Sequence, residues 1–406
     1  MRCGLLGEHL SHSYSPLIHS YWGEYTYELF DKKPEELDLF LKGGAFLGIN
    51  VTAPYKKAVI PYCSQLTQEA KRLGAVNTIV QTNDGLIGHN TDFFGFSYML
   101  KKSGLQVFGK KVLVLGSGGA AAAVLGVLSD AGANAINISR KGDHNYGNLH
   151  NHQDARIIVN ATPVGMYPNT GFSPLNLRQF PHLEGVLDVI YNPARTQLLM
   201  DAEELGIPTM NGLWMLVAQA KEAAEWFSSK NIHEEQIEAV YSALCQRLQN
   251  IVLIGMPGCG KSLIGKSLAM LTGKTFVDTD LLIEAQAGKK IADIFREDGE
   301  IFFRNLETQV IQEVGKKSGL VIATGGGCVC RPENYQLLHQ NGTIVWLQRN
   351  IELLETTGRP LSQCTELSQI YEVRKALYEH FADHKVMNDS TPEHAAQQIV
   401  ALEVRK

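Results

Sequence analysis

The stretch IVLIGMPGCGKS at residues 251–262 begins with four apolar residues and runs into the pattern G-x-x-x-x-G-K-S. In this pattern the glycines let backbone N–H groups surround phosphate oxygens, Lys261 reaches the β- and γ-phosphates, and the Ser262 hydroxyl ligates Mg²⁺. Residues 263–271 supply the helix that must follow the loop. The sequence therefore predicts an α/β nucleotide-binding unit near residue 249, whose phosphate contacts are Gly258, Cys259, Gly260, Lys261 and Ser262.

The composition is that of an ordinary globular chain. Its 406 residues predict two or three domains at about 150 residues each. A net charge of −5 offers no basic surface, so neither nucleic acid nor a membrane is expected as a partner. The N-terminus lacks the apolar core of a signal peptide, and the most apolar window, residues 112–128, is broken by glycines. Seven scattered cysteines indicate free thiols and a cytoplasmic location.

Short apolar runs alternate with amphipathic segments throughout the chain, a pattern typical of α/β folds with parallel sheets. Helices are expected over 91–103, 120–131, 213–227 and 234–248. Strands are expected at 3–6, 25–30, 47–51 and 77–81 in a first unit, and at 111–115, 134–138, 156–160 and 186–190 in a second, Rossmann-like one.

A second glycine-rich turn lies between the strand at 111–115 and the helix that follows it. Gly116, Gly118 and Ala121 fit the dinucleotide fingerprint, in which a tight turn brings the pyrophosphate to a helix N-terminus. The next strand ends in Arg140 and Lys141, whose positive charge suits the 2′-phosphate of NADP. The nearby Asp143 leaves NAD as an alternative cofactor. A further alternative is that Arg140 and Lys141 are only solvated loop charges. The expected cofactor contacts are Gly116, Ser117, Gly118, Gly119, Ala120, Ser139, Arg140 and Lys141.

Residues 1–247 carry seven further segments that bear on function: HSYSP (12–16), NVTAPYK (50–56), GAVNT (74–78), NTD (90–92), NAT (160–162), DVIYNP (188–193) and NGLWMLVAQ (211–219). In this order the segments resemble the shikimate dehydrogenase family. The resemblance implies that Lys56 and Asp92 are the catalytic pair and that Thr162, Gly212 and Met215 adjoin NADP. It also implies substrate contacts from Ser13, Ser15, Thr52, Asn77, Tyr191 and Gln219.

Elementary chemistry agrees with reduction of a ketone, because an ammonium oriented by a carboxylate can deliver a proton to oxygen while a hydride reaches carbon. Two alternatives remain open at this stage. Lys56 alone reads as a surface lysine, and Asp92 alone as the N-cap of the following helix.

The chain after the phosphate loop contains FVDTDLLIE (276–284), IFREDGEIFFRNLE (294–307), TGGG (324–327), GRPL (358–361) and RKALY (374–378). Residues 249–406 thereby resemble shikimate kinase, a three-layer α/β protein of the nucleoside-monophosphate kinase type. The resemblance implies that Asp280 binds shikimate hydroxyls and accepts a proton, and that Asp278 and Ser262 hold Mg²⁺. The remaining implied roles are carboxylate binding by Arg304 and Arg374, ring contact by Gly326 and Gly327, and transition-state stabilisation and ATP contact by Arg359.

Two points in this second half stay open. Arg304 and Glu307 are spaced as a helix-surface ion pair. The lid segment 353–359 is short and lacks the additional arginine that often begins it in this family, which leaves the adenine contact unassigned.

Together the two resemblances imply a bifunctional cytoplasmic enzyme of aromatic biosynthesis, which reduces 3-dehydroshikimate with NADPH and phosphorylates shikimate with ATP and Mg²⁺. The expected domains are 1–95 with 212–247 for substrate, 96–211 for NADP, and 249–406 for the kinase. A homodimer is possible. The rivals are an NAD-dependent oxidation of quinate or shikimate by the first half, and a metabolite sensor that keeps the fold without the chemistry.

Overall fold

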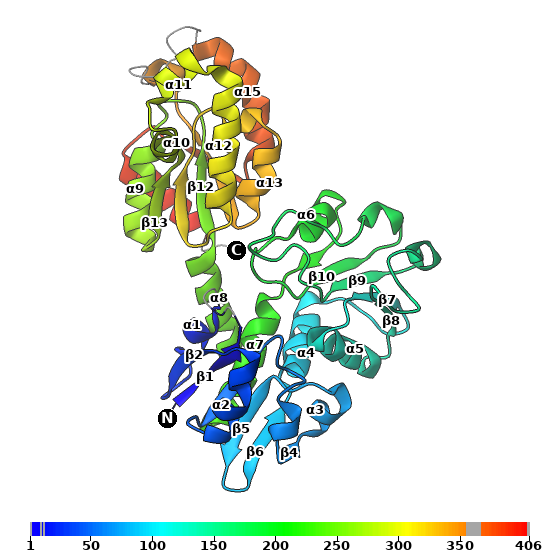
Figure 1. Ribbon diagram of the computed structural model, residues 1–406. Coiled ribbons are helices and arrows are strands. Elements are labelled where there is room, and N and C mark those ends of the chain that lie inside the picture. Colours follow the sequence, from blue (N-terminus) through cyan, green and yellow to red (C-terminus); the bar gives the residue numbers. More distant parts are fainter. Residues whose placement is uncertain (1, 9, 11–12, 355–366, 404–406) are drawn as a thin grey trace. The chain divides into compact units, whose positions relative to one another are not determined.

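The computed structural model describes residues 2–8, 10, 13–354 and 367–403, drawn as ribbons in Figure 1. They form two compact units, and the division falls inside helix α8 (Glu235–Leu248). The N-terminal unit comprises Met1–Met166, Phe172–Tyr191 and Leu198–Ala243. The C-terminal unit comprises Tyr167–Gly171, Asn192–Gln197 and Leu244–Lys406.

The first sheet of the N-terminal unit has six strands in the order β2-β1-β3-β5-β6-β4. Its strands are β1 (Arg2–Gly7), β2 (Thr26–Asp31), β3 (Gly48–Val51), β4 (Gln65–Leu66), β5 (Thr78–Thr82) and β6 (Gly85–His89). The helices within this stretch are α1 (Ser15–His19), η1 (Pro34–Glu36), α2 (Leu37–Gly43), η2 (Ile60–Tyr62) and α3 (Gln68–Leu73).

This sheet is mixed, although the alternation of apolar and amphipathic segments is typical of folds with parallel sheets. Strand β5 runs antiparallel to both β3 and β6. Only Asn83 and Asp84 separate β5 from β6, and Gly85 follows at φ 113°. A connection of two residues forms a hairpin and is too short for the crossover that parallel strands require.

The second sheet of the N-terminal unit is wholly parallel, in the order β11-β10-β9-β7-β8. Its strands are β7 (Lys111–Leu115), β8 (Asn134–Ile138), β9 (Ile157–Asn160), β10 (Gly185–Asp188) and β11 (Thr209–Met210). The associated helices are α4 (Asp92–Ser103), α5 (Gly119–Asp130), η3 (Leu149–His152), η4 (Leu177–Gln179), α6 (Gln197–Glu204) and α7 (Leu213–Ser228).

The C-terminal unit contains a third sheet, also wholly parallel, in the order β13-β14-β12-β15-β16. Its strands are β12 (Asn250–Ile254), β13 (Thr275–Asp278), β14 (Leu320–Ala323), β15 (Gly342–Gln348) and β16 (His384–Met387). Its helices are α9 (Lys261–Thr272), α10 (Thr279–Ala287), α11 (Ile291–Glu297), α12 (Gly299–Gly315), η5 (Cys328–Cys330), α13 (Glu333–His339), η6 (Ile351–Leu353), α15 (Leu367–Phe381) and α16 (Pro392–Glu403).

The central strands of this third sheet are buried on both faces, as parallel strands covered by helices should be. Every residue of β12 is buried, and Trp346 of β15 stacks near Tyr378 of α15 with ring centroids 5.6 Å apart. The carboxyl ends of β12, β13 and β14 lead directly into the phosphate loop, α10 and the TGGG segment. This edge of the sheet is where open α/β folds bind ligands.

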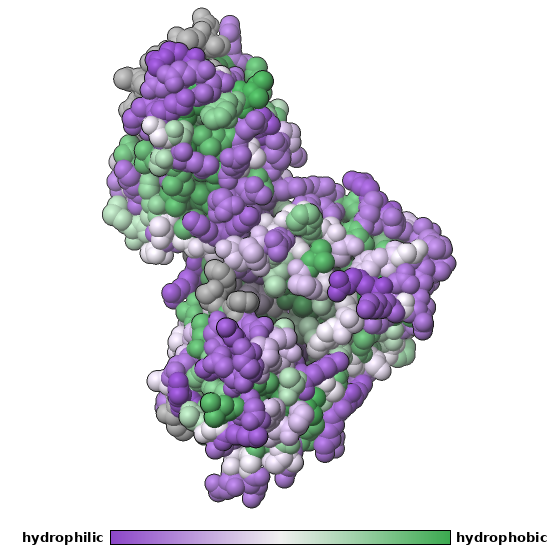
Figure 2. Space-filling model, viewed as in Figure 1, coloured by the Kyte–Doolittle hydropathy of each residue, from purple (hydrophilic) through white to green (hydrophobic). Residues whose placement is uncertain are grey.

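The surface carries scattered apolar side chains among polar ones, as Figure 2 shows for one face. In the C-terminal unit Leu263, Met270 and Leu281 on α9 and α10 are more than half exposed. Within the ranges described above, no helix has the length and apolar character needed to cross a membrane. The six described cysteines are free thiols, which confirms that expectation for them.

Candidate active sites

The N-terminal unit brings Lys56 and Asp92 together, with Nζ and Oδ2 2.5 Å apart. Lys56 lies in the turn after β3, and Asp92 is the first residue of α4. The lysine side chain is 21% exposed and the aspartate 9%, so the interpretation of Lys56 as a surface lysine is wrong. The N-cap of α4 is Thr91, which also corrects the alternative that Asp92 fills that position. Asp92 instead supplies negative charge to the first turn, where the helix dipole favours it.

A buried hydrogen-bonded cluster surrounds this ion pair. Asn77 accepts a bond from the backbone N–H of Thr91 at 2.7 Å and donates from Nδ2 to the Thr91 hydroxyl at 3.1 Å. The same hydroxyl lies 3.3 Å from Oε1 of Gln219 on α7. Two expected substrate contacts, Asn77 and Gln219, are therefore linked through Thr91, the residue before Asp92 of the ion pair.

The other expected substrate contacts lie in neighbouring segments of the same unit. Ser13 accepts a hydrogen bond from the backbone N–H of Ser15, which is buried at the start of α1. Thr52 is half-buried directly after β3. The rings of Tyr191 and Tyr14 lie 5.4 Å apart, and burial, followed by the effect of Tyr14, raises the pKa of Tyr191 to about 12. Its phenol therefore stays protonated and able to donate a hydrogen bond.

Residue patterns alone missed a buried network beneath Ser15. Tyr27 donates a 2.7 Å hydrogen bond to Oδ1 of Asn50, and the Ser15 side chain opposes the rise that burial causes in the pKa of the same phenol. His19 stacks on Tyr27 with ring centroids 4.0 Å apart, and its Nδ1 is 2.7 Å from the hydroxyl of Tyr25. Asn50 belongs to the NVTAPYK segment, so position within that motif was the available signal.

The dinucleotide turn joins β7 to α5 as the fingerprint requires. Gly116 has φ 119°, a conformation that favours glycine, and a Cβ there would meet the carbonyl oxygen of Ala161 at 2.8 Å. A Cβ on Gly119 would lie 3.1 Å from Cδ of Lys56, so the turn passes directly beside the ion pair. Glycines in such a turn let the backbone approach the pyrophosphate of a nicotinamide cofactor closely.

The remaining expected cofactor contacts follow β8 and β9 or lie at the start of α7. Arg140 and Lys141 are exposed and form no ion pair with a described residue, whereas Ser139 is half-buried. The hydroxyl of Thr162 donates to Oδ1 of Asn160 at 2.7 Å. Met215 is buried, and Gly212 fits only without a side chain, because a Cβ there would lie 1.9 Å from the carbonyl oxygen of Val189.

The phosphate loop of the C-terminal unit lies between β12 and α9. Lys261 folds back over the loop, and Nζ donates to the carbonyl oxygens of Gly255 and Met256 at 2.9 and 3.0 Å. These carbonyls hold the ammonium over the loop. Cys259 is buried, and its carbonyl oxygen accepts a 2.8 Å bond from Nδ2 of Asn388.

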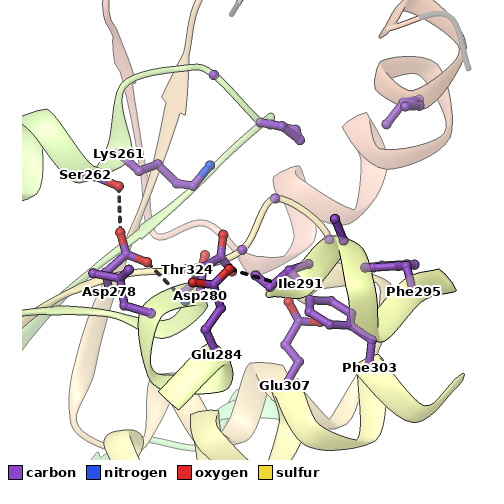
Figure 3. Close-up of a pocket in the computed structure, with 18 of the residues that line it drawn as sticks. Lys261, Ser262, Asp278, Asp280, Glu284, Ile291, Phe295, Phe303, Glu307 and Thr324 are labelled. Atoms are coloured by element: carbon purple, nitrogen blue, oxygen red, sulfur yellow. Dashed lines mark hydrogen bonds between the residues drawn. The ribbon is translucent and has the colours of Figure 1, made fainter. Parts of the chain in front are cut away.

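A cavity of about 870 Å³ opens in front of this loop. In Figure 3, Lys261 and Ser262 enter it from α9, and Phe303 and Glu307 face it from α12. The Ser262 hydroxyl donates a 2.7 Å hydrogen bond to Oδ2 of Asp278. A hydroxyl and a carboxylate oxygen side by side suit Mg²⁺, which prefers oxygen ligands and keeps several waters.

Asp280 projects into the cavity from the first turn of α10. Its Oδ1 is buried and has no hydrogen-bond partner among the described residues. Burial, with a further contribution from the Asp278 carboxylate, raises its pKa to about 6. Gly325 leaves room for this oxygen, since a Cβ there would lie 2.8 Å from Oδ1.

Arg304 and Glu307 form an ion pair at 2.8 Å, but the alternative that this is only a helix-surface pair is wrong. Arg304 is 6% exposed and Glu307 is fully buried, and both line the cavity. Burial raises the pKa of Glu307 against the opposing attraction of Arg304. A Cβ on Gly327 would lie 2.3 Å from Nη2 of Arg304, which explains the glycine at that position.

Arg374 reaches the same region from α15, and its Nη1 donates to the carbonyl oxygen of Gly326 at 3.2 Å. The cavity thus gathers Asp278, Asp280, Arg304, Gly326, Gly327 and Arg374, as expected. Arg359 and most of the lid segment 353–359 lie outside the described residues. Residue patterns missed Thr279, whose hydroxyl accepts from the backbone N–H of Gly325, and Arg349, which lines the cavity.

Comparison with known proteins assigns both units. A family model described as "Shikimate dehydrogenase substrate binding domain" matches residues 5–79. A curated shikimate dehydrogenase (NADP(+)) from Clostridium perfringens is 34% identical over 263 residues, covering 59% of this chain and 97% of its own. The chain belongs to the shikimate dehydrogenase family. A second family model, "Shikimate kinase", matches residues 257–403, so a shikimate kinase domain follows the dehydrogenase.

Solved structures agree with the assignment of the dehydrogenase. The Thermus thermophilus shikimate 5-dehydrogenase in complex with NADP(H) and shikimate is 32% identical, with a TM-score of 0.55. It matches 60% of this chain and 99% of its own. A quinate dehydrogenase from Corynebacterium glutamicum in complex with NAD is 27% identical, with a TM-score of 0.54, over 60% of this chain and 99% of its own.

Proposed function

We propose that this chain reduces 3-dehydroshikimate to shikimate with NADPH and then phosphorylates shikimate at its 3-hydroxyl with ATP and Mg²⁺, two consecutive steps of aromatic biosynthesis. The observation that carries the proposal is that one chain joins two enzyme families whose names share one metabolite. A cytoplasmic location is part of the proposal and rests on the free cysteines.

In the dehydrogenase, the bound NADPH supplies the hydride. Lys56 holds the proton that the substrate oxygen receives, and the Asp92 carboxylate, 2.5 Å from its Nζ, orients it. The hydroxyls of Ser13 and Ser15 hold the substrate carboxylate, and Asn77 and Gln219 fix the ring hydroxyls. The remaining substrate contacts are Thr52 and Tyr191.

The cofactor assignment rests on the turn at Gly116–Ala120 and on the charge after β8. Arg140 and Lys141 are exposed without ion-pair partners among the described residues, which leaves them available to a 2′-phosphate. Asp143 is exposed in the same loop and favours the rival, an NAD-dependent oxidation. The quinate dehydrogenase structure that resembles this unit is in complex with NAD.

In the kinase, ATP supplies the phosphoryl group and Mg²⁺ neutralises part of its charge. Lys261 binds the phosphates, while Ser262 and Asp278 hold the metal. Arg304 and Arg374 bind the shikimate carboxylate, and Asp280 accepts the proton of the attacking hydroxyl. The partnerless buried oxygen of Asp280 supports this role, because a buried acceptor is costly until a donor reaches it.

The test is steady-state kinetics on the purified chain, with mass spectrometry of the products. The proposal expects shikimate from dehydroshikimate and NADPH, and shikimate 3-phosphate once ATP and Mg²⁺ are added. Better turnover with NADH than with NADPH would overturn the cofactor assignment. If neither half turned over its substrate, the metabolite-sensor rival would replace the proposal.

A further inference from the structure

The cationic side chains that line the kinase cavity differ in whether they already form hydrogen bonds or ion pairs with other residues of the protein. Lys261 donates to the loop carbonyls, and Lys290 pairs with Glu284 at 2.8 Å. Arg304 and Arg374 are engaged as described above. Arg349 also lines the cavity, yet it makes no ion pair or hydrogen bond with any described residue.

Arg349 is also partly withdrawn from water. Its side chain is half-buried, and Nε is a buried donor without a partner in the described part of the chain. Buried N–H groups in folded proteins nearly always donate a hydrogen bond, because a buried donor without an acceptor destabilises the fold. A donor of this kind at the wall of a ligand cavity indicates that the ligand brings the acceptor.

The position of Arg349 places it at the phosphate loop. It directly follows β15, the parallel neighbour of β12, and β12 leads into that loop. The first glycine of the loop, Gly255, packs against the backbone of Leu347, where a Cβ would lie 2.5 Å from the carbonyl oxygen. Asn388 joins the same two segments, since its N–H donates to the Gln348 carbonyl at 2.7 Å and its Nδ2 donates to that of Cys259 at 2.8 Å.

We propose that Arg349 is a nucleotide-binding residue of the kinase, whose guanidinium donates to phosphate oxygens of the bound nucleotide. This inference rests on the proposed kinase function. A planar guanidinium matches a phosphate bidentately, and a phosphate oxygen satisfies Nε–H. Stacking on the adenine ring would leave that donor without an acceptor. In the proposed function the shikimate carboxylate is bound by Arg304 on α12 and Arg374 on α15, so it does not need Arg349.

The experiment compares wild-type full-length chain with Arg349→Met, Arg349→Lys and the control Arg296→Met. Arg296 is 68% exposed on α11 and pairs with Asp293 and Glu297 outside the cavity lining. Kinase assays give KM for ATP and for shikimate, and calorimetry gives Kd for ADP and for adenosine.

Arg349→Met should raise the ATP KM and the ADP Kd by about 10- to 100-fold, as expected for loss of a charge-assisted hydrogen bond. The shikimate KM and the adenosine Kd should stay within about twofold of wild type, Arg349→Lys should recover part of the loss, and Arg296→Met should match wild type.

Three results would overturn the assignment: unchanged ADP affinity in Arg349→Met, equal losses for ADP and adenosine, or a rise confined to the shikimate KM. Failure of the proposed function is distinguishable. In that case wild type would lack kinase turnover with shikimate, while the ADP measurement would still decide the role of Arg349.

Discussion

At the scale of single residues, the chemistry of each site depends on groups that the rest of the unit has partly withdrawn from water. Lys56 is held between the Asp92 carboxylate and the space left by Gly119. Asp280 and Arg349 each keep a buried polar atom without a partner among the described residues. A buried polar atom without a partner favours ligand binding, because the ligand supplies the missing hydrogen bond.

His19 provides a test of burial at this scale. Burial lowers its pKa from 6.5 to about 3 in the folded chain, so between these values the unfolded chain binds a proton that the folded chain does not. The free energy of unfolding must therefore fall as pH drops below about 6.5, by about 2 kcal/mol per such group between pH 7 and pH 5.

Hydrogen exchange in peptides of β1 and β3, corrected for intrinsic rates, measures this free energy in the N-terminal unit. His19→Phe keeps a ring to stack on Tyr27 and cannot be protonated, so its stability should fall by about 2 kcal/mol less over the same pH range. An identical fall in both proteins would show that His19 is not the titrating group.

At the scale of elements, the close packing of α4 on α7 joins Asp92 to Gln219. Gly95 allows this close packing of the two helices, since a Cβ there would lie 2.7 Å from the carbonyl oxygen of Met215 and 2.9 Å from Cβ of Gln219. Gly95→Val should force the helices apart and destabilise the N-terminal unit by about 1–3 kcal/mol.

The same variant should lower dehydrogenase kcat/KM through displaced Asp92 and Gln219, while kinase activity stays unchanged. Gly43→Ala, at the end of α2 where no atom lies within 4 Å of the new Cβ, is the control. Thermal unfolding and both assays report the outcome, and a Gly95→Val enzyme with normal stability and reduction would contradict this account of the interface.

Elements with a strong local signal could be predicted from sequence. Strands β7 and β12 are apolar runs ending in glycine turns, and both turns have the expected neighbours. Strands β4 and β6 could not be predicted, because β4 has only two residues and β6 contains two glycines. Both are recognised as strands only through their pairing with neighbouring strands. Likewise, spacing predicted the Arg304–Glu307 pair but not its burial, which depends on the packing of α12 within the unit.

At the scale of the whole molecule, the two units have separate hydrophobic cores and separate nucleotide-binding turns. The two chemistries should therefore be independent. Covalent linkage does not by itself imply that shikimate is channelled, because a free product is not tethered and diffuses away.

The most direct test measures both activities in the same preparations of wild type, Lys56→Ala and Lys261→Ala. We expect Lys56→Ala to lose about 10²- to 10⁴-fold in dehydroshikimate reduction, as for loss of a general acid, with phosphorylation within about twofold of wild type. Lys261→Ala should lose phosphorylation of shikimate, with dehydroshikimate reduction close to that of wild type. Loss of both activities in either folded variant, or normal phosphorylation in Lys261→Ala, would contradict the claim that one chain carries two independent active sites for shikimate.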